Sequence, residues 1–136
     1  MRAAERGSTS VELVLLTPVL VGLLLLTVAF GRVQNARADI EAASRTAARA
    51  ASLERSASAA TFAGEQAATA ELDASGYDCT SQRIDVDTSG FAPDTKVTVT
   101  VACTVDLADV TGMGIPTSRT LVARFSEPLD RFRGTR

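Results

Sequence analysis

The feature that most constrains this chain is an unbroken apolar run near its amino terminus. From Leu13 to Gly31 there are 19 consecutive uncharged residues, rich in Leu and Val, bounded by Glu12 and Arg32. As a helix rising ~1.5 Å per residue, the run is ~28 Å long, which matches the hydrocarbon core of a bilayer. The sequence therefore predicts a single-pass membrane helix, which we assign to residues 11–31.

A secretory signal peptide is the alternative interpretation of this run. Arg2 and Arg6 give a positive start, and Ala36-Arg37-Ala38 fits the A-x-A cleavage pattern, so cleavage there would release a soluble module beginning at Asp39. The apolar region of a signal peptide is usually ~7 to 15 residues long, which favours a retained span. The observed cleavage site would distinguish the two.

Composition limits what the rest of the chain can do. The 136 residues leave room for one small domain beside the span. The formal net charge is -2 with a single Lys, so there is no basic field to attract nucleic acid. The absence of His removes the commonest general base and metal ligand. We therefore expect no enzyme activity, no cofactor and no nucleic-acid partner.

Two cysteines, Cys79 and Cys103, follow the span. An even number in an exported domain suggests one disulfide, although two buried thiols are the plainer alternative.

The orientation of the span in the membrane is not settled by its flanking charges. Two arginines precede the span and four follow it closely, so the positive-inside rule alone favours a cytoplasmic carboxyl-terminal domain. We place the amino terminus inside because Asp39 and Glu41 lie among the later arginines and a disulfide would not persist in the cytosol.

Two residues of the span need a physical explanation. Glu12 would cost several kcal/mol inside a membrane unless it lies at the interface or is paired; an interfacial Glu that caps the helix start is the simplest reading. Pro18 removes one backbone donor and crowds the carbonyl of Val14, which predicts a kink.

The helical pattern continues beyond the membrane. Small and apolar residues recur at steps of three and four, as a heptad seam suited to packing on other helices or on the chain's own domain: Val33, Ala36, Ile40, Ala43, Ala47 and Ala50. We assign residues 32–58 to a helical stalk, with Glu41 and Arg45 spaced for an i,i+4 ion pair. A second helix is predicted from Thr61 to a stop near Gly76.

The remainder predicts a small α+β domain at residues 59–136, with a three-stranded antiparallel sheet behind the helices. Apolar residues alternate strictly over 96–107, a shorter alternation around 84–86 forms a hairpin with it, and a third strand is expected at 120–126. If Val86 faces Val97, Thr80 faces Cys103, so pairing with Cys79 requires a bulge near residues 80–82.

One segment resembles half of a calcium-binding loop. Asp85, Asp87 and Ser89 alternate before Gly90, but Lys96 occupies the twelfth position, where a bidentate Glu belongs. This favours a solvated strand edge and turn, so no metal is expected.

The order Arg6-Gly7-Ser8-Thr9-Ser10-Val11-Glu12, followed at once by the apolar run, resembles the processing site of type IV prepilins and their TadE-like relatives. The resemblance extends through Pro18 to residue 49. It implies that a prepilin peptidase cuts after Gly7, that Ser8 becomes the new amino terminus, and that Glu12 makes an assembly contact. Leu13 stands where many pilins of the tight-adherence class carry an aromatic residue, which favours a minor subunit.

The resemblance thus implies a TadE-like pseudopilin of the cytoplasmic membrane that helps to assemble a tight-adherence pilus or a related secretion apparatus. Its partners would be other pilins, the inner-membrane assembly platform, the prepilin peptidase and the lipid bilayer. The alternative function is an exported binding module. Residues 71–109 contain eight acidic residues and only two basic ones, Arg83 and Lys96, and this acidic balance could suit a basic ligand.

Overall fold

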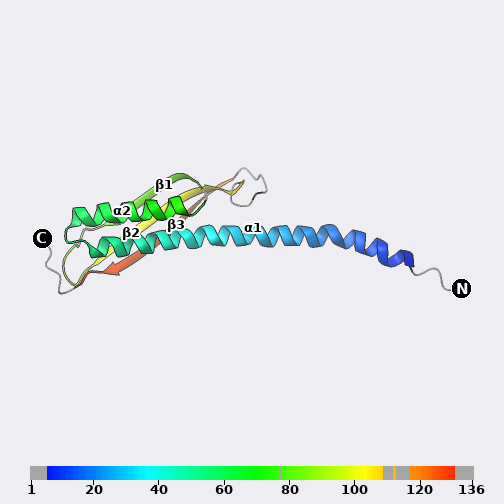
Figure 1. Ribbon diagram of the computed structural model, residues 1–136, viewed down its shortest axis with the longest axis horizontal. Helices are drawn as coiled ribbons and strands as arrows, with labels where there is room; N and C mark the ends of the chain where they lie inside the picture. The colour runs from blue at the N-terminus through cyan, green and yellow to red at the C-terminus, as the bar shows by residue number, and fades with distance from the viewer. Residues whose placement is uncertain (1–5, 77, 109–111, 113–116, 131–136) are drawn as a thin grey trace.

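The computed structural model describes residues 6–76, 78–108, 112 and 117–130, with side chains from Glu12 onward in those ranges. Within them, two helices precede three strands: α1 (Arg6–Leu53), α2 (Ala57–Ala74), β1 (Cys79–Asp87), β2 (Lys96–Asp106) and β3 (Ser118–Pro128). Figure 1 shows α1 as a long, gently curved helix whose carboxyl-terminal part packs beside α2 and the sheet, while its amino-terminal part extends alone. The predicted α+β arrangement is confirmed.

The heptad seam of α1 lies in the core of this fold. Ala36 and Ile40 are 2% and 1% exposed, and further along the seam Ala43 and Ala47 are fully buried. The alanines let α2 and the sheet approach closely, and the branched Ile40 fills the largest space among them. Residues of the predicted stalk and of the predicted domain therefore share one core. The predicted boundary between them at residue 58 stays a prediction.

The ion pair expected between Glu41 and Arg45 does not form in the described part of the chain. Instead the Arg45 guanidinium lies over the ring of Phe125 in β3, 5.3 Å from its centroid. A planar cation is attracted to the face of an aromatic ring, whereas an exposed i,i+4 pair contributes only ~0.5 kcal/mol or less. The contact ties the outer side of α1 to β3.

Helix α2 begins four residues earlier than the sequence pattern predicted. Ser56 is its N-cap, with extended backbone angles, and its hydroxyl accepts a hydrogen bond from the Ala59 amide at 3.3 Å. This satisfies one of the free donors of the first turn. The predicted stop is confirmed: the helix ends at Ala74, and Gly76 adopts φ +78°, a conformation that a side chain would disfavour.

The sheet has the order β1-β2-β3, and both pairs are antiparallel. The inward residues of β2 (Val97, Val99, Val101, Cys103 and Val105) are all at most 2% exposed, which confirms their predicted alternation. Leu121 and Ala123 of β3 cover the same core at 8% exposure each. α1 packs on β2 and β3, and α2 packs on β1 and α1.

The hairpin register assumed from the sequence is wrong by two residues. Val86 pairs with Val99 and not with Val97, so Gln82 stands opposite Cys103. The assumed register would place Asp87 opposite Lys96 and leave residues 88–95 between the last paired positions. In the structure Asp87 pairs with Thr98, so residues 88–97 connect them, and the Thr95 N–H donates to the Ala92 carbonyl at 3.2 Å within this turn. The predicted bulge is confirmed, as a register shift between Cys79 and Ser81.

Candidate functional site

The amino-terminal part of α1 is an exposed apolar helix, which we call the apolar arm (residues 12–30). Large hydrophobic side chains cover all its sides, from Leu13 at 69% exposure to Phe30 at 63%. By length and composition α1 is the one candidate membrane span among the described residues. A helix that is apolar all round has to be covered, and with so little of it buried in its own domain, lipid or other helices are the available surroundings.

The arm meets the domain at Ala29, which is 5% exposed although its neighbours are open. Gly112, which follows β2 in the chain, lies close to α1: a Cβ added to it would lie 3.3 Å from Nη1 of Arg32. Gly112 itself has φ +69°. The apolar arm therefore ends where the packed domain begins, with Arg32 as the first charged residue beyond it.

The two threonine hydroxyls of the arm form hydrogen bonds within the helix. The Thr17 hydroxyl donates to the Leu13 carbonyl at 2.7 Å, and the Thr27 hydroxyl donates to the Leu23 carbonyl at 2.9 Å. Such internal bonds suit a helix surrounded by hydrocarbon, where an unsatisfied polar group is costly. Pro18 lies inside α1 without interrupting it, and a kink there stays a prediction.

The residues of the predicted processing site lie at the amino-terminal end of this helix. Gly7 and Ser8 are in the first turns of α1, and Glu12 follows one turn after Ser8 with its side chain exposed. Four helical residues span ~6 Å, so a charge at the position of Ser8 and the Glu12 carboxylate would lie in the same thin layer. Processing at Gly7 and an assembly contact by Glu12 remain predictions.

The predicted disulfide is present, joining Cys79 at the start of β1 to Cys103 in β2 with their Cα atoms 5.4 Å apart. The bulge between Cys79 and Ser81 makes this pairing possible, because an unbroken ladder would turn the two side chains to opposite faces. Cys103 is fully buried, so the bond anchors the start of β1 to the centre of the core.

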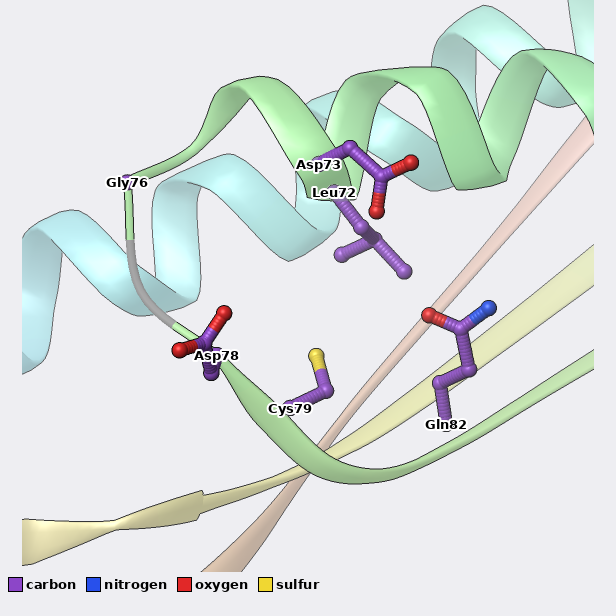
Figure 2. A pocket seen from close by; sticks show the side chains of 6 residues that line it. All are labelled: Leu72, Asp73, Gly76, Asp78, Cys79 and Gln82. Atoms are coloured by element: carbon purple, nitrogen blue, oxygen red, sulfur yellow. The ribbon is translucent and has the colours of Figure 1, made fainter.

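A pocket opens beside this disulfide. Figure 2 shows the Cys79 sulfur pointing toward Leu72 between two carboxylates, Asp73 at the end of α2 and Asp78 just before β1, with Gln82 across the opening. The pocket holds about 220 Å³ and only part of its lining is apolar. Among the described residues that line it, the one thiol, Cys79, is cross-linked and is therefore not available as a nucleophile.

The partial calcium-loop motif forms a turn. The Asp87 carboxylate accepts a hydrogen bond from the Ser89 amide at 3.0 Å. Hydrogen bonds from the Ser89 side chain and backbone lower the pKa of Asp87 below its ordinary value, with a smaller contribution from the charge of Arg124. Within the described residues, no group of three or more acidic, Cys or His side chains could hold a metal ion.

The sequence pattern did not identify Gly64 as a contact point. Gly64 is buried where α2 crosses α1 and β1, and a Cβ there would come within 3.1 Å of Val86 Cγ2 and 3.4 Å of the Ala51 Cβ. The signal available in the sequence was the spacing of Ala60, Gly64 and Ala68, which puts one small residue on each successive turn of the same helix face.

Together these features define a class of protein: a small disulfide-closed α+β domain carried on a long helix whose free end is suited to a membrane. A family model described as TadE-like protein matches residues 7–49, the segment that contains the G-x-x-x-x-E element, the apolar arm and the first turns of the buried seam. Comparison with curated proteins and with solved structures gives no match. The family match suggests involvement in tight-adherence pilus assembly, a structural rather than enzymatic task, and interaction with other pilus components.

Proposed function

We propose that this chain is a membrane-anchored minor pseudopilin that takes part in assembling a tight-adherence pilus or a related secretion apparatus. One observation carries the proposal: within the matched range, the G-x-x-x-x-E element and an exposed apolar arm of membrane length lie on one uninterrupted helix. A prepilin peptidase needs its substrate site at the membrane surface, and Gly7 is placed just before the arm begins.

In this proposal residues 1–10 stay on the cytoplasmic side, the arm crosses the membrane, and the domain with its disulfide lies outside. The partners are other pilins or pseudopilins, the inner-membrane platform, the prepilin peptidase and the bilayer. The Cys79–Cys103 disulfide supports this orientation, since disulfides persist in oxidising compartments outside the cytosol.

Glu12 has a specific role in the proposed assembly. After cleavage at Gly7, the Ser8 ammonium and the Glu12 carboxylate of one copy partly neutralise each other. When copies stack, the carboxylate of one meets the ammonium of the next in a low-dielectric seam, where an unpaired charge would be costly. The pair then fixes the axial register between neighbours, which an interfacial glutamate alone would not do.

The alternative, a soluble binding module released after Ala38, is less compatible with the packing. Cleavage there would cut α1 between Ala36 and Ile40, which are 2% and 1% exposed in the same core cluster. The released domain would begin inside its own core helix, without the contacts of Ala36 and Val33. Proteolytic cleavage that releases a folded domain usually occurs in an exposed linker and not within a core helix.

The experiment is an intact mass of the protein extracted from membranes of its native host, together with two variants. Gly7→Val should abolish the loss of residues 1–7, whereas the control Gly31→Val, at a position with open space around it, should not. Glu12→Gln should leave membrane insertion and the disulfide intact but impair pilus assembly, with Glu54→Gln as its control. A mature chain that starts at Asp39, or normal assembly by Glu12→Gln without a wild-type copy, would contradict the proposal.

A further inference from the structure

The outer face of α2 is an unoccupied surface with a defined chemistry. Phe62 is 63% exposed there, at one end of a shallow groove along the helix that also contains Glu65, Thr69 and Asp73. These side chains lie opposite Gly64 and Leu72, which face the core. Among the described residues, neither acid of the groove has an ion-pair partner.

The outer face of α1 has the opposite charge. Arg37, Arg45 and Arg49 are exposed along the part of α1 that belongs to the domain, with Glu41 the one acid in the same row. Arg45 lies over Phe125 of β3, so this row faces the β3 side of the molecule, while α2 covers β1. Within one copy the acidic groove and the basic row therefore point in different directions and do not meet.

We propose that the groove on α2 binds α1 of a second copy of this chain. The argument is a match of spacing as well as of charge. Glu65 and Asp73 are separated by two turns of α2, and Arg37 and Arg45 are separated by the same two turns of α1. Midway between the two acids of α2 lies the uncharged Thr69, and midway between the two arginines of α1 lies Glu41. Thr69 and Glu41 would therefore stand opposite each other, and no two like charges are paired.

The chain direction agrees with this match. The two helices of one copy form an antiparallel hairpin, so α2 also runs antiparallel to α1 of a neighbour anchored in the same membrane (Figure 1). In an antiparallel contact, placing Glu65 opposite Arg45 automatically places Asp73 opposite Arg37. The same alignment brings the exposed ring of Phe62 to within one residue of the level of Arg49, where it can make a cation–π contact of the kind that Arg45 already makes with Phe125.

The contact requires a small axial offset between copies. Gly64 stands level with the Ala47–Ala51 turn of its own α1, because its Cβ position is 3.4 Å from the Ala51 Cβ and 3.5 Å from the Ala47 carbonyl oxygen. Pairing Glu65 with Arg45 of the neighbour raises that neighbour by about three residues, or ~4.5 Å, away from the membrane. Two different surfaces are used, so the contact is head-to-tail and repeats as an open, staggered series.

This inference rests on one part of the proposed function, that both copies are anchored in the same membrane. Its test needs neither the peptidase nor the pilus machinery. The full chain, carrying the photo-reactive residue p-benzoylphenylalanine in place of Phe62, is reconstituted in vesicles of zwitterionic phosphatidylcholine. Illumination should give a dimer cross-linked to α1 near Arg49, mapped by mass spectrometry. Raising the salt concentration about tenfold should reduce its yield.

Charge reversal supplies the decisive comparison. Glu65→Arg with Asp73→Arg in the probe copy should lower dimer yield about tenfold or more, and adding copies with Arg37→Glu and Arg45→Glu should restore it. Asp78→Arg with Asp85→Arg, two exposed acids outside α2, should have little effect. An intact disulfide and unchanged circular dichroism show that each variant is folded.

Three outcomes would each overturn the assignment of these two faces to one another. The cross-link could form on lipid or on another part of the chain, or the dimer yield could stay unchanged when the charges of α2 are reversed. The third is a lowered dimer yield that the complementary α1 variant fails to restore. None of these outcomes bears on cleavage at Gly7 or on Glu12, so a failure here is distinguishable from a failure of the proposed function.

Discussion

The Cys79–Cys103 disulfide gives the most direct test of what stabilises the domain. The two residues are 24 apart in sequence, and closing a loop of that size lowers the entropy of the unfolded chain by an amount worth about 3.5 kcal/mol. Small domains are stable by only about 5 to 15 kcal/mol, so the cross-link accounts for a large share. Its loss should multiply the population of open molecules by about 300.

Hydrogen exchange on the full chain in detergent micelles measures this population. Amides of β2, which include the buried Cys103, should lose protection by about 300-fold when the protein is reduced, because they exchange only when the domain opens. Amides of the apolar arm should not change, since their hydrogen bonds lie within one helix outside the domain, and they serve as the internal reference.

Two further comparisons separate the cross-link from packing. The reduced wild type keeps both sulfur atoms, whereas the double variant Cys79→Ala and Cys103→Ala also removes them from the core and should be somewhat less protected than the reduced protein. Unchanged protection of β2 after complete reduction would refute the reasoning, because the domain would then be held by its core alone.

Two other predictions concern packing and pH. Gly64→Val should destabilise the domain by about 1 to 3 kcal/mol in urea unfolding, because its first carbon already meets Val86 at 3.1 Å; Gly22→Val, in open space, is the control, and equal stability of the two would contradict this reading. The lowered pKa of Asp87 means that its bond to Ser89 stabilises the loop above the ordinary pKa of 3.8 and is lost as pH falls through the lower folded value. Loop amides should therefore exchange faster at acidic pH relative to those of β2, while in Asp87→Asn, whose side chain does not titrate, this extra acid dependence should disappear.

Local patterns were sufficient for the individual elements. The length and composition of the run before Gly31 predict a membrane helix because both are properties of one segment, independent of its neighbours. The strict alternation from Lys96 likewise predicts β2, since strand side chains alternate whatever the strand pairs with. The disulfide followed from the number of cysteines and the expected compartment, and the bulge followed from its geometry.

Predictions that required two segments to be placed together were less accurate. The register of β1 on β2 was wrong by two residues because alternation is unchanged by a two-residue shift. The two pairings differ only in how many residues lie between the last paired positions, 88–97 in the structure and 88–95 in the assumed register. The start of α2 was placed too late because the alanine-rich sequence gives little hydrophobic contrast, and the cap at Ser56 was overlooked.

The sequence alone determined the apolar arm, the heptad seam, the alternating strand and the cysteine pair, because each depends on residue type and spacing within the chain. The tertiary structure decided that the seam is buried in the domain, that Arg45 contacts Phe125 and not Glu41, and that Gly64 lies where three elements meet. It also decided that the acidic groove of α2 and the basic row of α1 point in different directions within one copy. Periodicity establishes which residues share a face, but the face that each one meets depends on distances that only the packed chain sets.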